Sequence, residues 1–453
     1  MLIEDVSIKS VGGHGIFNSG AYDHNAIEVN GIIEAKSQYY SGVTSDAAYT
    51  TVNVTETGDI VGYNAITVDG DNATISNDGH LNAYSVGIYV DGIGSKITNT
   101  GSIVAGSNYT EVYTGTAVYI DEGSTFNFAN TGNVSATYGV TIKSSEGVIT
   151  NSELAGIHGT HIAIQIDNLS GQSVEIINED ACGITSDGFA IRGSDGSERV
   201  TNAGYMKGKI SLGAGNDSFD NQDGLIDHAI DGGTGDDIYI LGSASDQIVD
   251  GAGKDSVHTE FTSSLKSYST IENLKLLGSG NISGTGNALT NVIIGNDGNN
   301  ILNGGPDSVV DTLIGGKGND TYVLGSGSDK VTDTAGTDTI TSTIGRSMAY
   351  YGLIENLKLL GTGNISGTGN SLANVIIGNS GNNILNGGVE TTAVIDTLNG
   401  GAGNDTYVLG SGADKVIDSA GYRHDHLSGV SATSPPLQRS KTSSFWVSPI
   451  SAA

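Results

Sequence analysis

Aspartates that recur every nine residues are the side chains in this sequence with the clearest chemical potential. The stretch Gly315–Thr341 reads GGKGNDTYV, LGSGSDKVT and DTAGTDTIT, and Asp320, Asp329 and Asp338 each take the sixth place of a nonapeptide. Glycines before these aspartates permit tight turns with positive φ, so each carboxylate follows a turn. Regularly spaced carboxylates and turn carbonyls are the oxygen ligands that a hard cation such as Ca²⁺ prefers.

The elements that would position these carboxylates are short β-strands. Tyr322, Val331 and Ile340 take the eighth places of the three nonapeptides, where the alternation of a strand would point them into a core. Two nonapeptides would make one coil of a stacked solenoid, with Asp320 and Asp338 on the same edge. Stacked strands lie about 4.8 Å apart, so carboxylates and carbonyls of successive coils would converge on one ion.

The nonapeptide GGKGNDTYV resembles the RTX, or haemolysin-type, calcium-binding repeat, whose pattern is GGxGxDxUx. The resemblance implies a parallel β-roll that binds several Ca²⁺ ions. Asparagine takes the sixth place at Asn300 and Asn383, where we expect weak or empty sites because its oxygen is neutral. The predicted metal ligands are Asp217, Asp237, Asp246, Asp255, Asp311, Asp320, Asp329, Asp338, Asp396, Asp405 and Asp414.

A longer unit of about 83 to 85 residues contains these nonapeptides and begins at Gly232, Gly315 and Gly400. The third copy breaks off, because the comparison predicts an aspartate at position 423 and the chain has Arg423. We expect residues 422–453 to be an unrelated, disordered tail that arises from a frameshift, a truncated gene or an extension.

A second, looser repeat of 21 to 31 residues runs through the N-terminal half and predicts the coils of a parallel β-helix. It resembles the β-helical passenger regions of bacterial surface proteins and, more distantly, the polysaccharide lyase and epimerase fold. One asparagine recurs in each coil, and these residues would stack as a structural ladder. The ladder positions are Asn77, Asn99, Asn130, Asn151, Asn178 and Asn202, with Asn221 as the next.

The fold class that follows is all-β, a parallel β-helix solenoid that runs into an RTX-type parallel β-roll. We expect a β-helix over residues 1–210 and calcium-binding repeats over residues 211–421. The segments LGAGNDSFD and FDNQDGLI overlap at this boundary, and they satisfy the nonapeptide pattern and the asparagine pattern together. No flexible linker is therefore expected between the two parts.

The amino-acid composition of the chain limits the classes of molecule that it is expected to bind. The 50 acidic residues against 19 basic ones give a formal charge of −31, which favours cations and argues against nucleic acid or an anionic membrane. No apolar run has the length of a membrane span, and no N-terminal secretory signal is visible. Proteins with the RTX repeat leave bacteria by type I secretion through a C-terminal signal, so the resemblance implies an extracellular or cell-surface location. No such signal is recognisable in the tail.

The function that we expect is calcium binding in a non-enzymatic structural or adhesive protein whose folding depends on calcium. An adhesin would also bind a cell-surface polysaccharide or a host surface. The alternative is a β-helical polysaccharide lyase or epimerase that carries RTX modules. Such chemistry needs clustered acids and bases, whereas basic residues such as Lys96, Lys143 and Arg192 are scattered. His158 and His161, on an expected loop, are the nearest approach to a site, and we interpret them as surface residues.

Overall fold

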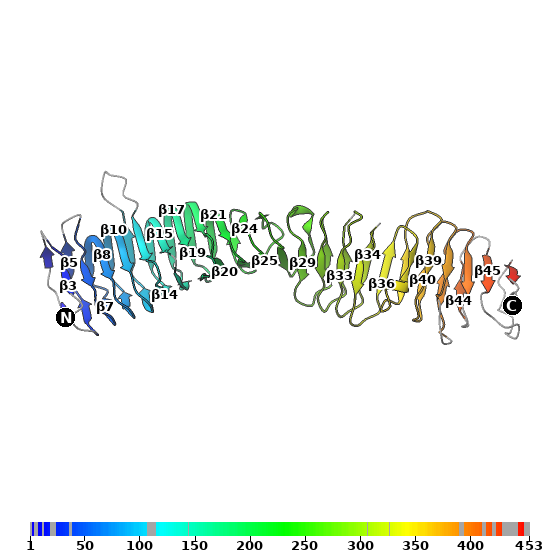
Figure 1. Ribbon diagram of the computed structural model, residues 1–453, viewed down its shortest axis with the longest axis horizontal. Coiled ribbons are helices and arrows are strands. Elements are labelled where there is room, and N and C mark those ends of the chain that lie inside the picture. Colours follow the sequence, from blue (N-terminus) through cyan, green and yellow to red (C-terminus); the bar gives the residue numbers. More distant parts are fainter. Residues whose placement is uncertain are drawn as a thin grey trace. The chain divides into compact units, whose positions relative to one another are not determined.

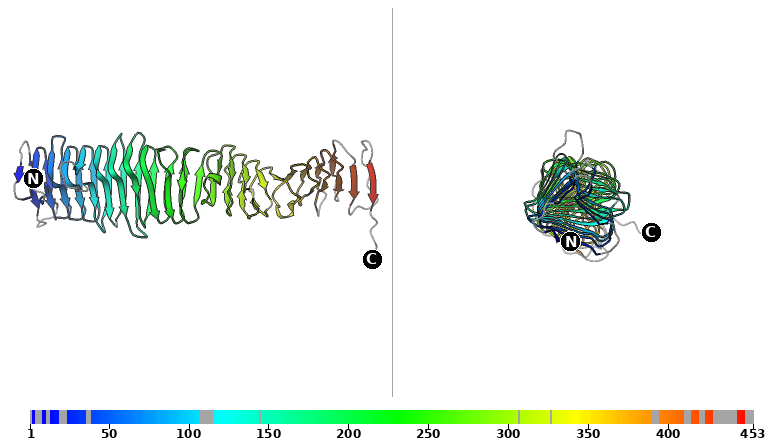
Figure 2. Two further views of the ribbon diagram at one scale, coloured as in Figure 1. Left: turned by 90° about the horizontal axis from the view of Figure 1, so that it is seen from above. Right: turned by 90° about the vertical axis from the view of Figure 1, so that its left-hand side faces the viewer.

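The computed structural model describes residues 2–3, 8–10, 13–18, 24–35, 39–106, 115–143, 145–305, 307–325, 327–388, 394–409, 414–418, 423–427 and 443–447. The chain forms two compact units, Met1–Val257 and His258–Ala453. In each unit short strands stack in parallel, coil upon coil (Figures 1 and 2). The predicted fold class, an all-β parallel solenoid, is confirmed.

Two long sheets form most of the first unit. In order of pairing, the first consists of β1 (Leu2–Ile3), β4 (Ala26–Val29), β7 (Thr51–Val54), β9 (Thr74–Asn77), β11 (Ser95–Asn99), β14 (Thr125–Asn130), β16 (Glu146–Asn151), β18 (Ser173–Asn178), β20 (Ser197–Asn202), β22 (Ser218–Asn221), β25 (Ile238–Leu241) and β27 (Ser256–Thr259). The second consists of β2 (Ile8–Ser10), β5 (Ile32–Ala35), β8 (Asp59–Val68), β10 (His80–Val90), β12 (Ser102–Ala105), β15 (Asn133–Lys143), β17 (Gly156–Asp167), β19 (Gly183–Arg192), β21 (Tyr205–Ala214), β24 (Ile230–Thr234) and β26 (Ile248–Val249). The short strands β3 (Ile16–Asn18), β6 (Val43–Ser45), β13 (Thr116–Ile120) and β23 (Leu225–Ile226) pair beside the second sheet.

Three stacks of strands form the second unit. One contains β29 (Asn273–Leu276), β31 (Val292–Ile294), β33 (Thr312–Ile314) and β35 (Lys330–Thr332). Another contains β28 (Ser263–Ser264), β30 (Ser283–Thr285), β32 (Ile301–Asn303), β34 (Thr321–Leu324), β36 (Thr339–Ser342), β38 (Asn356–Leu359), β40 (Val375–Ile377), β42 (Thr397–Asn399) and β44 (Lys415–Ile417). The last contains β37 (Arg346–Ser347), β39 (Ser366–Thr368), β41 (Ile384–Asn386), β43 (Thr406–Leu409), β45 (Arg423–Leu427) and β46 (Ser443–Val447). Two single-turn 3₁₀ helices, η1 (Leu265–Ser267) and η2 (Met348–Tyr350), interrupt the strands.

Apolar side chains stack in register to make the core of each unit. In the first unit one column joins Val200 of β20 to Phe219 of β22 and Phe219 to Tyr239 of β25. All three are buried, so the column passes from the looser repeat into the nonapeptide repeat without a break. In the second unit Tyr322 and Ile340 pair in register and are fully buried, as the strand alternation predicts.

Val331 differs from its expected place in the core. It lies on β35 and is only half-buried, because β35 is the last strand of its stack and no further described strand covers it. It lines a surface cavity instead. The eighth place of a nonapeptide is therefore a core position only where the stack continues.

The predicted asparagine ladder is present in the first unit. Each side-chain amide donates from Nδ2 to Oδ1 of the next asparagine, at distances of 2.7 Å from Asn77 to Asn99 and 2.9 Å from Asn151 to Asn178. The intervening and following rungs repeat the bond, through Asn130 and Asn202 to Asn221. The amides are buried, so the ladder satisfies polar groups that would otherwise lie unpaired in the core.

Most of the predicted tail, residues 422–453, lies outside the described residues. The two described segments are β45, which pairs with β43, and β46, which pairs with β45. Thr406 is the register partner of His424, which places Arg423 opposite Asp405. Arg423 therefore stands where the coil would have its sixth-place aspartate, as the comparison of the long repeats predicts.

Candidate metal centres

Sixth-place aspartates form ladders along the edges of both units. In the first unit the backbone N–H of Asp217 donates to Asp237 Oδ1 (2.8 Å), and the N–H of Asp237 donates to Asp255 Oδ1 (2.9 Å). In the second unit the N–H of Asp320 donates to Asp338 Oδ1 (2.7 Å). One oxygen of each accepting carboxylate is therefore held by the turn of the preceding coil.

The remaining predicted ligands follow the same rule, with one exception. Asp329, Asp405 and Asp414 accept backbone N–H groups of the preceding coil at 3.2, 2.8 and 3.1 Å, respectively. Asp311 and Asp396 do so at 2.8 Å. Asp246 instead accepts the side-chain amide of Asn221 at 3.2 Å, so this aspartate ends the asparagine ladder.

Several of these carboxylates keep one oxygen that is buried without a hydrogen bond. Among the described residues, Oδ2 of Asp217, Asp237, Asp320 and Asp405 has no hydrogen-bond partner. An unpaired buried acceptor costs free energy. A cation among these oxygens would remove that cost, so the donor set fits a hard metal ion.

Two groups of three carboxylates bring such oxygens together. Ligand atoms of Asp320, Asp333 and Asp338 lie within 4.8 Å of one another, and those of Asp237, Asp250 and Asp255 do the same. Calcium binds oxygen at about 2.3 to 2.6 Å, so one ion can contact all three members of a group. Each group combines two sixth-place aspartates from successive coils with a third aspartate.

The third aspartates, Asp250 and Asp333, were missed by the sequence analysis. Each is the first residue of a nonapeptide, eighteen residues after Gly232 or Gly315. The signal was available, since Asp418 takes the same place in the third copy of the long unit. The nonapeptide pattern fixes an aspartate only at the sixth place and therefore does not include the first.

Buried tyrosines hold the third aspartates in place. Tyr239 Oη donates to Asp250 Oδ1 (2.8 Å) and Tyr322 Oη donates to Asp333 Oδ1 (2.9 Å). Burial and the nearby carboxylates raise the pKa of both hydroxyls, so they stay protonated donors. A Cβ at Gly315 would collide with Tyr322 Oη and Asp320 Oδ2, which explains the glycine at the first place of that nonapeptide.

Burial and mutual repulsion favour protons on these carboxylates when no cation is bound. Burial raises the pKa of both Asp237 and Asp320 to about 6. Burial and the hydrogen bond to the adjacent first-place carboxyl raise the pKa of Asp338 to about 7 and that of Asp255 to about 8. A divalent cation offers the opposite charge that would ionise all three members of a group.

Where asparagine takes the sixth place, its side chain forms hydrogen bonds within its own turn and to the preceding coil. Asn300 Nδ2 donates to the carbonyl of Ile282 (3.1 Å) and to Asn296 Oδ1 (2.9 Å), and Asn300 Oδ1 accepts the N–H of Asn296 (2.8 Å). Asn383 repeats these bonds with Ile365 and Asn379. An amide N–H thus takes the space between coils, which supports the expectation of weak or empty sites there.

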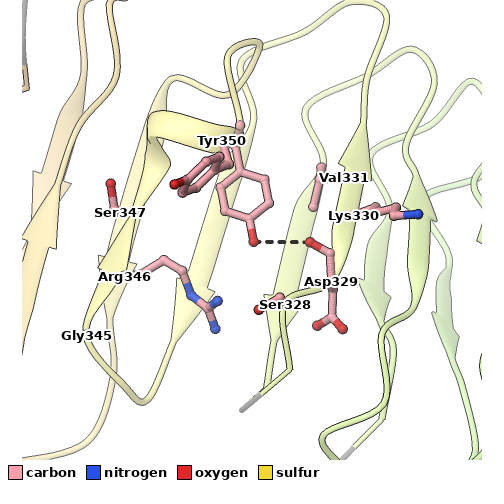
Figure 3. A pocket seen from close by; sticks show the side chains of 9 residues that line it. Ser328, Asp329, Lys330, Val331, Gly345, Arg346, Ser347 and Tyr350 are labelled. Carbon is pink, nitrogen blue, oxygen red and sulfur yellow. Dashed lines mark hydrogen bonds between the residues drawn. The ribbon is translucent and has the colours of Figure 1, made fainter.

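An arginine contacts the turn that leads to Asp329. Arg346 donates to the carbonyls of Gly325 (2.7 Å) and Gly327 (3.3 Å), beside a cavity of about 610 Å³ shown in Figure 3. Tyr351 Oη donates to the carbonyl of Asp329 (3.1 Å). A side-chain cation thus hydrogen-bonds two carbonyls of this turn. The equivalent residue of the preceding copy is Ser263, so the repeat gave no signal for it.

The third copy keeps part of the three-carboxylate arrangement. Burial raises the pKa of the Tyr407 hydroxyl, and the neighbouring carboxylates Asp418, which hydrogen-bonds it, and Asp405 raise that pKa further. The position that the third aspartate of the group would take, in the next coil, is Arg423 in this copy. This copy therefore has two of the three carboxylates.

The residues considered for an enzyme site have other contacts. His158 and His161 lie on β17 and not on the expected loop. His158 Nδ1 hydrogen-bonds Thr185 Oγ1 (3.0 Å), and the ring of His161 packs edge-on against Tyr138. Lys143 pairs with Asp167. The HGTH segment is a strand because it pairs in register with the next coil, where Gly159 lies opposite Ser186.

Comparison with known proteins identifies the repeat. A family model described as RTX calcium-binding nonapeptide repeat (4 copies) matches residues 230–261, 285–308, 310–331, 368–389 and 395–416. Comparison with curated proteins and with solved structures gave no match. Among the described residues, no helix is long and apolar enough to span a membrane. The chain therefore carries RTX calcium-binding nonapeptide repeats, arranged along an all-parallel β-solenoid.

Proposed function

We propose that this protein binds several calcium ions through its aspartate ladders and folds in response to them, as a non-enzymatic structural or adhesive protein outside the cell. The observation that carries the proposal is the group Asp320, Asp333 and Asp338. These three buried carboxylates converge within 4.8 Å. Such an arrangement is unfavourable alone and favourable around a divalent cation.

Calcium-driven folding follows from the same groups. The ligands of one ion come from successive coils, as Asp320 and Asp338 do, so an unfolded chain offers no preformed site. The free energy of binding then becomes free energy of folding. At the low calcium concentration of a cytosol the charge of −31 opposes compaction, and millimolar calcium outside the cell would reverse the balance.

The test is a calcium titration of the full chain after removal of metal. We expect circular dichroism to show a gain of β-structure up to millimolar calcium, with heat of binding for several ions by calorimetry. An equal concentration of magnesium should be less effective, because magnesium dehydrates reluctantly and demands stricter geometry. Identical β signals in chelator and in calcium would contradict calcium-driven folding, and an absence of binding heat would contradict the metal sites.

The extracellular location is supported by the repeat type, because RTX repeat proteins are typically secreted. Expression in a bacterium that carries a type I exporter tests it: the full chain should accumulate in the medium, and a form that ends before residue 422 reports whether the last residues direct export. Retention of the full chain inside the cell would contradict type I secretion.

An adhesive role requires a surface ligand, and we propose cell-surface polysaccharide or a host surface as its class. Calcium-loaded protein should then bind polysaccharide-coated or host-cell surfaces in a saturable way. Loss of this binding on chelation would connect adhesion to the folded solenoid. Saturable binding to neither surface would leave a structural role in place of the adhesive one.

A further inference from the structure

A fully buried glutamate lies one coil before the first aspartate of the ladders. Glu198, on β20, is only 1% exposed, and neither of its carboxylate oxygens has a hydrogen-bond partner among the described residues. A carboxylate in this environment is costly unless it is paired with a cation or protonated. Burial and the neighbouring Asp217 accordingly raise the pKa of Glu198 to about 8.

The turn that contains Glu198 has the sequence pattern of a nonapeptide, although it lies outside the matched repeats, which begin at residue 230. Residues 193–201 read GSDGSERVT, with Gly193 first, Gly196 fourth, Glu198 sixth and Val200 eighth. Val200 is the register partner of Phe219, the eighth residue of the next nonapeptide. This turn does not match the aspartate pattern because glutamate takes its sixth place.

The geometry of this turn repeats that of the later ones. The N–H of Glu198 donates to Asp217 Oδ1 at 2.7 Å, as the N–H of Asp217 donates to Asp237 Oδ1 at 2.8 Å. The carbonyl of Gly196 lies against Gly215, just as the carbonyl of Gly215 lies against Gly235. The coil of Glu198 is therefore the first coil of the roll in its backbone as well as in its sequence.

Oxygens from two coils meet beside Gly193. A Cβ on Gly193 would lie 2.7 Å from Glu198 Oε2 and would collide with the carbonyl oxygen of Leu212. Asp217, which is 2% exposed, has an Oδ2 without a hydrogen-bond partner among the described residues. The space that a side chain would fill at Gly193 is thus bordered by a carboxylate oxygen and a carbonyl oxygen, as expected of a cation cradle.

We propose that Glu198 and Asp217, together with the carbonyl of Leu212, bind a calcium ion at the first coil of the roll, two coils before the first matched repeat. The proposal rests on calcium binding by the aspartate ladders and adds a site to them. Calcium at this position joins β20 to β22, so it stabilises the end of the asparagine-ladder region directly.

The test compares Glu198→Gln with Glu179→Gln in the full chain. Glu179 is exposed one coil earlier, so its variant loses a carboxylate without touching the proposed site. Equilibrium dialysis against calcium should show one ion fewer per chain for Glu198→Gln and no change for Glu179→Gln. Circular dichroism in saturating calcium checks the fold, and Glu198→Asp, which keeps the carboxylate on a shorter side chain, should restore the ion with weaker affinity.

Hydrogen exchange of the peptide that covers β20 provides a local reading. Calcium should increase amide protection there in the unmodified chain and in Glu179→Gln, and should do so much less in Glu198→Gln. Equal calcium stoichiometry and equal protection in all three proteins would overturn this site while leaving the ladders intact. Absence of calcium binding by the unmodified chain would instead overturn the proposed function as a whole.

Discussion

Carboxylates in this protein act in groups that join neighbouring coils. Asp333 shows why the first place of a nonapeptide matters as much as the sixth: it is buried, it accepts a hydrogen bond from Tyr322, and it faces Asp320 and Asp338. Affinity for calcium depends on the number of charged ligands. Two aspartates at the sixth place are therefore only part of the site.

Replacement of Asp333 with asparagine should weaken calcium binding at this group by roughly tenfold or more, which corresponds to about 1.4 kcal/mol. Asparagine preserves the shape and the acceptor for Tyr322 Oη but removes one negative charge. Calorimetric titration of the full chain measures the change. The control is Asp297→Asn, since Asp297 is exposed and pairs with Lys317 at the surface. Equal affinities in the two variants would show that Asp333 is no ligand.

Protonation should stabilise the calcium-free fold at acid pH. The folded-state pKa values of Asp237 and Asp320, about 6, and of Asp338 and Asp255, about 7 and 8, exceed the usual unfolded value of about 4. The folded state therefore binds more protons than the unfolded state between about pH 4 and pH 8. Stability without calcium should fall as pH rises through this window.

Urea unfolding of metal-depleted protein at pH 4.5, 6 and 8 measures this dependence. In millimolar calcium the trend should reverse, because protons then compete with the ion for the same oxygens. A calcium-free stability that rises with pH would contradict the protonated state of these groups.

At the scale of elements, the asparagine ladder and the aspartate ladders are two solutions to one problem. Each coil leaves polar turn groups that face the next coil. In β9 to β22 asparagine amides satisfy them directly, from Asn77 to Asn221. In the nonapeptide coils one carboxylate oxygen accepts a backbone N–H, and in Asp320 the other oxygen has no hydrogen-bond partner among the described residues. The first arrangement satisfies its polar groups without metal, whereas under the proposed function the second needs a cation to do so.

Replacement of Asn151 with alanine should lower the free energy of unfolding by about 1 to 3 kcal/mol, because partners in the ladder lose hydrogen bonds in a buried setting. Asn151 Nδ2 donates to Asn178 and its Oδ1 accepts from Asn130. The loss should be similar with and without calcium. Denaturant unfolding measures it, and Asn127→Ala, at an exposed position of β14, is the matched control. Equal effects of the two substitutions would argue against a contribution of the ladder to stability.

At the scale of the whole molecule, net negative charge opposes the compact state. A formal charge of −31 over 453 residues repels itself, and every bound calcium ion removes two units of it. Each described strand pairs with strands of the adjacent coils. Stability therefore propagates from coil to coil.

Calcium should reduce the radius of gyration of the chain in solution at fixed ionic strength. Small-angle scattering in chelator and in millimolar calcium measures the change. Sodium chloride that supplies the same ionic strength is the control, because screening alone leaves the carboxylate groups unbridged. A radius that responds to salt and calcium alike would attribute compaction to screening.

Much of the fold and of the site follows from repetition. Asp320 and Asp338 share an edge because their spacing equals one coil, and the asparagines stack because each coil supplies one at the same place. Asp333 also repeats, as Asp250 and Asp418, so its position could have been predicted from the period of the long unit. Arg346 has no such equivalent in the preceding copy. When a residue does not recur with the repeat, the sequence pattern alone cannot distinguish it from an ordinary turn residue.

Periodicity in the sequence was enough to specify the parallel solenoid, the calcium-binding repeat and the asparagine ladder, because a fixed period fixes strand register and register fixes which side chains stack. Which oxygens remain without hydrogen bonds is instead a property of the packed coils, since it depends on how each turn of variable length meets the coil beside it. Glu198 shows the difference: its sixth place can be read from residues 193–201, but its complete burial without a partner among the described residues comes from the packing of two coils.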